Sequence, residues 1–164
     1  MKNFDIFHMY KLDKFHRIQL QNIEKDRILK SMNEEDYFKE RLKKFKIDIL
    51  PKNKKSHGKD DGVDFVIYYG NIICICQLKY WGKPIGKKYI KEIFGDMYLS
   101  NISLGFKEKN IKIIYMLICP FIYNQGAHEV NRYLNQNYYV IYGKMFVEFL
   151  INPLHFLNKI IMKE

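Results

Sequence analysis

The spacing of apolar residues near the start of the chain predicts two helices. A first helix is predicted over residues 15–31, where apolar side chains recur at roughly helical spacing: Phe15, Ile18, Ile23, Ile28 and Leu29. A second helix is predicted over residues 34–46, where Phe38, Leu42 and Phe45 share one face. Asn33 precedes this second helix as an N-cap, and three acids follow it, as suits the positive end of a helix.

Runs of β-branched and aromatic residues then predict strands at 47–50, 63–69, 72–79, 112–119 and 138–142. Gly70 and Asn71 separate the second and third runs, which predicts a two-residue hairpin turn. The third run is apolar on both faces as far as Gln77, which is typical of a central strand covered on both sides. Further helices are predicted over residues 87–100, 125–136, 143–151 and 153–162.

The order of these elements predicts an α/β layered domain with a central mixed β-sheet flanked by helices. A chain of 164 residues, 48% of them hydrophobic, is sufficient for one packed core. We divide it into an N-terminal helical extension, residues 1–32, and a main domain, residues 33–164. No apolar run reaches the length of a membrane span and no secretory signal pattern is evident, so we expect no membrane partner.

Cysteine usage favours a reducing environment. The chain has three cysteines, Cys74, Cys76 and Cys119, and an odd number without a signal peptide is typical of the cytoplasm or another reducing intracellular compartment, an organelle included. Cys74 and Cys76 are two apart in a predicted strand, so they point to one face and are poorly placed to pair. We interpret all three as small buried hydrophobes.

The charge pattern predicts a polyanionic partner. The chain has 28 basic and 18 acidic residues, giving a net charge of +10 and a pI near 9.4. Twelve lysines and four acids lie between residues 43 and 91, a local net charge of +8. We expect nucleic acid, DNA before RNA, although solubility and AT-rich codon usage also explain many lysines. The candidate phosphate contacts are Lys54, Lys55, His57, Lys59, Lys83, Lys87 and Lys88.

One group of residues in this basic region suggests chemistry. Asp64 lies at the start of one hairpin strand, and Gln77 and Lys79 lie near the end of its partner. Antiparallel pairing would bring them together, with Gln77 and Lys79 on one face. A carboxylate and an amide oxygen suit Mg²⁺ or Mn²⁺, and an ammonium beside them can stabilise the charge that develops in phosphodiester hydrolysis. The alternative is an Asp that caps a turn and a solvated Lys.

These residues carry a family resemblance. Asp61-Gly62-Val63-Asp64 followed by Gln77-Leu78-Lys79 resembles the PD-(D/E)XK nuclease superfamily, in particular the Mrr-type restriction endonucleases, which have Q-x-K in place of (D/E)-x-K. The resemblance covers about residues 33–150 and implies a restriction-endonuclease-like fold. It also implies metal-dependent DNA cleavage, with Asp64 as the metal-binding acid, Gln77 in place of the second acid and Lys79 as the catalytic lysine.

The family also carries a glutamate on the helix before the first strand. Glu35 is the best match, as a third metal ligand, and Glu34 is the next. The alternative for both is ordinary charge at the start of a helix. The chain departs from the family pattern at Lys46, where the family usually has glycine, and in its first 30 residues, for which we find no counterpart.

Three functional hypotheses follow. The first is a metal-dependent DNA endonuclease of the restriction or repair type. The second is a catalytically inactive nuclease-fold subunit that binds nucleic acid within a larger assembly, a ribonucleoprotein included, and the third is a binding or scaffold domain. A homodimer is compatible with cutting both strands of a duplex. The loop at residues 82–86 lacks the glycine-lysine pattern that cradles nucleotide phosphates, so no nucleotide cofactor is expected. Tyr80, Trp81 and Tyr89 are candidates for stacking on a base or for packing in the core.

Overall fold

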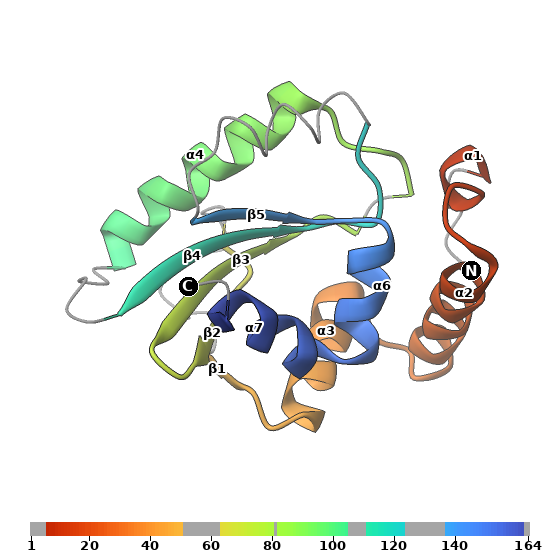
Figure 1. Cartoon of the computed structure of the whole chain (residues 1–164), viewed down its shortest axis with the longest axis horizontal. Helices are drawn as coiled ribbons and strands as arrows, with labels where there is room; N and C mark the ends of the chain where they lie inside the picture. The colour runs from red at the N-terminus through yellow and green to blue at the C-terminus, as the bar shows by residue number, and fades with distance from the viewer. Residues whose placement is uncertain (1–5, 51–62, 81, 105–110, 124–136, 163–164) are drawn as a thin grey trace.

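A five-stranded mixed sheet forms the centre of the protein, as seen in a computed structural model (Figure 1). The structure describes residues 6–50, 63–80, 82–104, 111–123 and 137–162. The strands lie side by side in chain order: β1 (Asp48–Leu50), β2 (Phe65–Tyr69), β3 (Ile72–Leu78), β4 (Lys112–Ile118) and β5 (Tyr138–Ile141). The first three strands are antiparallel to their neighbours, whereas β3, β4 and β5 run parallel. The predicted mixed α/β class is therefore confirmed.

Helices cover both faces of the sheet. Figure 1 shows α4 (Lys87–Leu104) across one face, and α3 (Glu34–Lys44), α6 (Lys144–Ile151) and α7 (Pro153–Met162) on the other. The first two helices, α1 (Ile6–Met9) and α2 (Lys14–Leu29), lie at the flank beside α6. The short α1 was not predicted, and the helix predicted over residues 125–136 lies outside the described residues.

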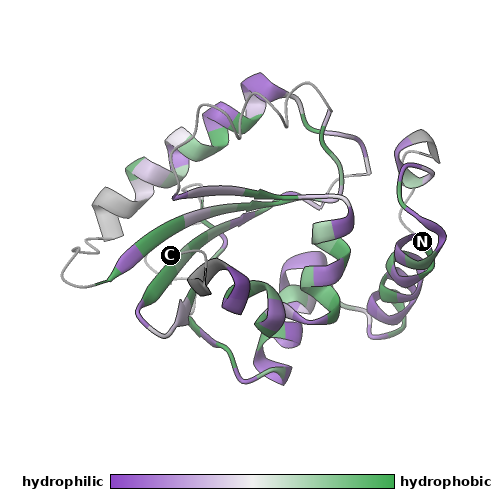
Figure 2. Cartoon of the chain, in the orientation of Figure 1, coloured by the Kyte–Doolittle hydropathy of each residue, from purple (hydrophilic) through white to green (hydrophobic). Residues whose placement is uncertain are grey.

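Strand β3 lies between two hydrophobic cores, as its uninterrupted apolar run predicted. All seven of its residues are buried, and the six apolar ones alternate between the core beneath α4 and the core beneath α3 and α6. Figure 2 shows β3 coloured largely as hydrophobic. Cys74 and Cys76 belong to the second of these cores and Cys119 to the first, all three as free buried thiols, as expected. None of the helices in the described ranges combines the length and apolar character that a membrane crossing requires.

Two residues with positive φ shape the chain around the hairpin: one lies in the hairpin turn, and the other lies between α3 and β1. Gly70 has φ of 60° in the two-residue turn between Tyr69 and Ile72, a conformation that glycine adopts without strain. Lys46 has φ of 58° directly after α3, where its N–H and that of Ile47 bond carbonyls of the last helical turn. Lys46 thus occupies a left-handed position that favours glycine.

The buried face of α2 differs from the predicted one. Leu20 and Ile23 are buried with His16 and Glu24, whereas Phe15 and Leu29 of the predicted apolar face are exposed. The apolar count along the helix misled the prediction because its buried face includes two polar residues that find partners in the fold. Leu20 and Ile23 join the same core as α3 and α6.

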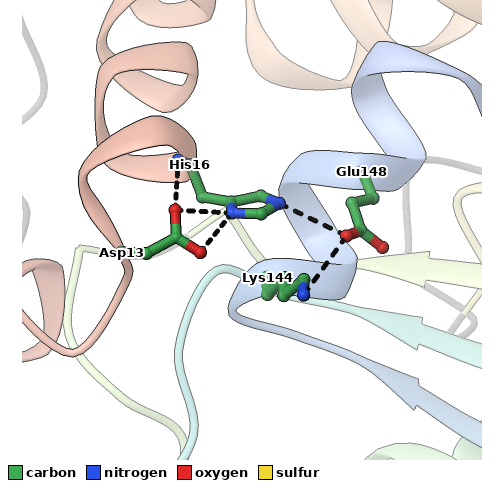
Figure 3. A network of polar contacts seen from close by, with 4 residues as sticks. All are labelled: Asp13, His16, Lys144 and Glu148. Carbon is green, nitrogen blue, oxygen red and sulfur yellow. Dashed lines mark hydrogen bonds and ion pairs between the residues drawn. The ribbon is translucent and has the colours of Figure 1, made fainter.

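A polar network attaches α2 to α6 (Figure 3). The Nδ1 atom of His16 lies 2.7 Å from Oδ2 of Asp13, and its Nε2 atom lies 3.3 Å from Oε1 of Glu148. Asp13 is also the N-cap of α2, because its Oδ1 accepts the backbone N–H of His16 at 2.8 Å. Lys144 lies 3.9 Å from the same Glu148 oxygen. The imidazole therefore bridges carboxylates from two segments that are far apart in sequence.

We expect Asp13→Asn to lower the melting temperature in a pH-dependent way. The backbone and side-chain hydrogen bonds from His16 lower the pKa of Asp13 below its ordinary value of 3.8. A lowered folded-state pKa stabilises the protein above pH 3.8, and this stabilisation is lost as the pH falls through the lower value. Asparagine keeps the capping oxygen but not the charge. Melting curves of the two proteins should therefore converge in acid, and a difference that is constant with pH would contradict this.

Candidate active site

Asp64 lies directly before β2 and is fastened to the end of β3. Its backbone N–H bonds the carbonyl of Cys76 at 2.8 Å, and its Oδ2 accepts the backbone N–H of Leu78 at 2.7 Å. The hairpin register pairs Phe65 with Cys76, so these two bonds bracket Gln77. The predicted juxtaposition of Asp64 with the end of β3 is confirmed.

Gln77 and Lys79 lie on the same side of the sheet, towards α4. Leu78 and Tyr80 belong to the core on the α3 side, and side chains alternate along a strand, so Gln77 and Lys79 point to the other side. Gln77 is only 2% exposed, and within the described structure its Oε1 atom has no hydrogen-bond partner. Lys79 is half-buried, and its backbone N–H bonds the carbonyl of Ile118 at 2.9 Å, which extends the pairing of β3 with β4.

Glu35 belongs to a helix that covers the other face of the sheet. It lies in the first turn of α3, which packs on the face opposite to Gln77 and Lys79. Its Oε2 is 3.5 Å from Nζ of Lys39 on the same helix, and its side chain is 33% exposed. The neighbouring Glu34 acts electrostatically on Arg27, where it helps to raise the pKa of the guanidinium, after the larger effect of the hydrogen bonds that Arg27 donates to Glu24. Both glutamates thus have partners on the α3 side of the sheet.

A buried ionic cluster beneath Tyr80 was missed by the sequence analysis. Glu24 of α2 is fully buried, and both its carboxylate oxygens accept hydrogen bonds of 3.0 Å from Arg27. The Arg27 guanidinium carbon is 6.0 Å from the ring of Tyr80, which is 4% exposed. Burial, followed by the charge of Glu24, raises the pKa of Tyr80 well above its ordinary value. The spacing of Glu24 and Arg27 was the available signal, but nothing in the sequence indicated that the pair is buried.

This cluster decides the role of Tyr80, the residue after Lys79. Its ring packs against Phe146 with ring centroids 5.4 Å apart and against Phe38 at 6.2 Å. Tyr80 is therefore a core residue, which is the packing alternative given above, and Tyr89 is 37% exposed at the start of α4. Trp81 lies outside the described residues. The packing of Tyr80 fixes the backbone on one side of Lys79.

The predicted phosphate contacts divide into two groups. Lys54, Lys55, His57 and Lys59 lie outside the described residues. Lys83 and Lys88 are exposed and Lys87 is half-buried, in or just before the first turn of α4. This turn has no acidic residue, although a helix N-terminus favours acids over lysines. The helix dipole and the lysines therefore add to one positive potential, which suits an anionic ligand.

A short bridge holds this lysine-bearing loop at the carboxyl ends of β3 and β4. Ile85 pairs with Ile122 in parallel, and its N–H bonds the carbonyl of Phe121 at 3.1 Å. Lys79 and the start of α4 therefore lie at the same edge of the sheet, where ligands bind in open α/β sheets.

The donor atoms at this edge are few. Within the described ranges, no three His, Cys, Asp or Glu side chains gather to hold a metal ion. Asp64 and Gln77 supply one carboxylate and one amide oxygen, and a site of this kind suits Mg²⁺, which retains several waters and uses substrate phosphates as ligands. Comparisons with protein-family models, with curated proteins and with solved structures give no match to this chain.

Proposed function

We propose that the protein is a metal-dependent nuclease that hydrolyses phosphodiester bonds in DNA, with its centre at Asp64, Gln77 and Lys79. The buried amide oxygen of Gln77 carries this proposal, since it has no hydrogen-bond partner within the described structure. An unsatisfied buried polar atom costs about 1–3 kcal/mol. A bound cation would satisfy this oxygen, and the Asp64 carboxylate at the adjacent strand end would supply the opposite charge.

The residues present fit a magnesium ion. Asp64 and Gln77 offer hard oxygen ligands, and Mg²⁺ takes only one or two carboxylates from a protein in many phosphate-processing sites. When bound, the ion supplies polarisation of the phosphoryl oxygen and a more acidic water. Lys79, on the same side of the sheet as Gln77, would neutralise charge that develops on the phosphate. We leave Glu35 out of the metal site because its helix covers the other face.

A second candidate function is a nuclease-fold subunit that binds nucleic acid without cutting it. Two contacts favour it: the Asp64 carboxylate bonds the backbone of Leu78, and the Glu35 carboxylate pairs with Lys39. Each acid thus has a structural role independent of metal. The lysines at the start of α4 support nucleic-acid binding under both candidates, so metal-dependent cleavage is what separates them.

The direct test is incubation of the purified protein with supercoiled plasmid DNA and Mg²⁺ or Mn²⁺. We expect nicking or linearisation that EDTA abolishes and added metal restores. A parallel incubation with RNA tests whether the sugar matters. Failure to cleave any of these substrates, together with retained DNA binding in a fluorescence anisotropy assay, would favour the second candidate.

Gln77→Met should separate metal binding from stability. Methionine has a similar length but no oxygen that would be buried without a hydrogen-bond partner. We therefore expect the free energy of unfolding, measured by urea denaturation, to be unchanged or up to about 3 kcal/mol higher. The Mg²⁺ concentration for half-maximal cleavage should rise by about 10- to 100-fold, the range for loss of a group that supports a metal. Gln21→Met, on the half-buried side of α2, is the matched control. A marked loss of stability in Gln77→Met would indicate a structural partner for the amide and contradict the proposal.

A further inference from the structure

The turn before α2 and the first turn of α2 present two aromatic rings to solvent. Tyr10 is 68% exposed and Phe15 is 60% exposed, although side chains of this kind are usually packed in cores or interfaces. The guanidinium carbon of Arg17 lies 4.7 Å from the centre of the Tyr10 ring, which orders the ring on the surface. Ile18 lies one helical turn beyond Lys14, on the same side of α2, and is 42% exposed.

This outward surface is also positively charged. Lys14 and Lys25 are exposed and Arg17 is half-buried. The only acid between Lys14 and Lys25 is Glu24, which is fully buried in its bond to Arg27. Asp13, at the helix start, points towards His16 (Figure 3). We call the resulting surface the outer face of α2, and its members are Tyr10 of the preceding turn and, on the helix itself, Lys14, Phe15, Arg17, Ile18 and Lys25.

We propose that the outer face of α2 binds single-stranded nucleic acid. Unpaired bases would stack on Tyr10 and Phe15, and the lysines would contact the phosphates. Stacking requires bases released from a duplex, so the exposed rings favour a single strand over double-stranded DNA. The proposal rests on the proposed function for the class of ligand, and adds where the unpaired strand is held.

The outer face adjoins the edge of the sheet that carries the candidate active site. The ring of His8 in α1, two residues before Tyr10, lies 6.0 Å from the rings of both Phe121 and Tyr123. Tyr123 is 53% exposed and lies against Gly86, the residue before α4. A single-stranded nucleic acid that extends from Tyr10 would therefore reach Tyr123 and then the first lysines of α4.

Binding of fluorescein-labelled oligo(dT), oligo(rU) and a duplex, followed by anisotropy in EDTA, tests this proposal without cleavage. The variant with both Tyr10→Ala and Phe15→Ala should bind the two single strands at least about tenfold more weakly. Its affinity for the duplex should change less than twofold. In Lys14→Gln with Lys25→Gln, the salt dependence of single-strand binding should fall by about 0.7 per lysine.

Leu29→Ala is the matched control, because Leu29 is the most exposed apolar residue at the other end of the same helix, at 84%. Equal losses in the control and in the aromatic variant, equal losses for duplex and single strands, or no loss at all would overturn the proposal. So would a wild-type dimer that the aromatic variant dissociates, since that would assign the face to a second copy. Because no metal is present, absence of nuclease activity would leave this binding result unaffected, and the reverse also holds.

Discussion

Asp64→Asn is expected to reduce plasmid cleavage at least about a hundredfold while leaving the fold intact. Asparagine keeps an oxygen that accepts the backbone N–H of Leu78, which Asp64 binds at 2.7 Å, but it lacks the charge that a metal requires. Lys79→Met should lower the rate by about 100- to 1,000-fold, the cost of removing one preorganised donor from a transition state. Initial rates of nicking at saturating Mg²⁺ measure both effects.

Two substitutions remove the same kinds of charge away from the candidate active site and serve as controls. Asp48→Asn alters an exposed acid of β1, and Lys159→Met alters an exposed lysine of α7, on the α3 side of the sheet. Both should retain wild-type rates. Asp64→Asn should also bind DNA at least as tightly as the wild type, since it removes a negative charge near the phosphates. Cleavage that persists in Asp64→Asn and in Lys79→Met would show that the activity belongs elsewhere.

Glu24→Ala should have the largest effect on stability. It leaves the Arg27 guanidinium, whose side chain is 13% exposed, without its carboxylate partner, and breaking a buried pair in this way costs about 3–5 kcal/mol. Urea denaturation with intrinsic fluorescence measures the change.

The chain supplies a matched comparison for the buried pair. Lys30 and Glu40 form an ion pair of 2.9 Å whose side chains are 43% and 46% exposed. Glu40→Ala should therefore cost no more than about 1 kcal/mol, because water screens an exposed pair. Similar losses for Glu24→Ala and Glu40→Ala would mean that Arg27 finds another partner or reaches water, and would contradict the assignment of Glu24 as a buried anchor.

The strands and the position of Asp64 were predictable because their signals are local. A β-branched run on each side of Gly70 and Asn71 fixes the hairpin, and counting outward from a two-residue turn places Asp64 against Gln77. The run of β3 that is apolar on both faces as far as Gln77 likewise predicted its central position, because a strand covered on both faces is buried along its length.

The remaining features depend on contacts between distant segments. The buried face of α2 is selected by α6, because His16 meets Glu148 there, and no helical periodicity contains that information. Glu24 and Tyr80 are far apart in sequence, so their common burial was not foreseeable from either segment. Glu35 matched the family pattern by position along the chain, but the side of the sheet that a helix covers is decided by the packing of the whole domain.

The core on the α3 side of the sheet joins the beginning of the chain to its end. Leu20 and Ile23 of α2 share this core with Phe146 and Phe149 of α6. During synthesis at about 5–20 residues per second, α2 leaves the ribosome several seconds before the helix it packs against. The contacts of α2 with α6 therefore form late, after the hairpin and α4 are available. A chaperone or a nucleic acid present in that interval would meet α2 before its buried face is covered.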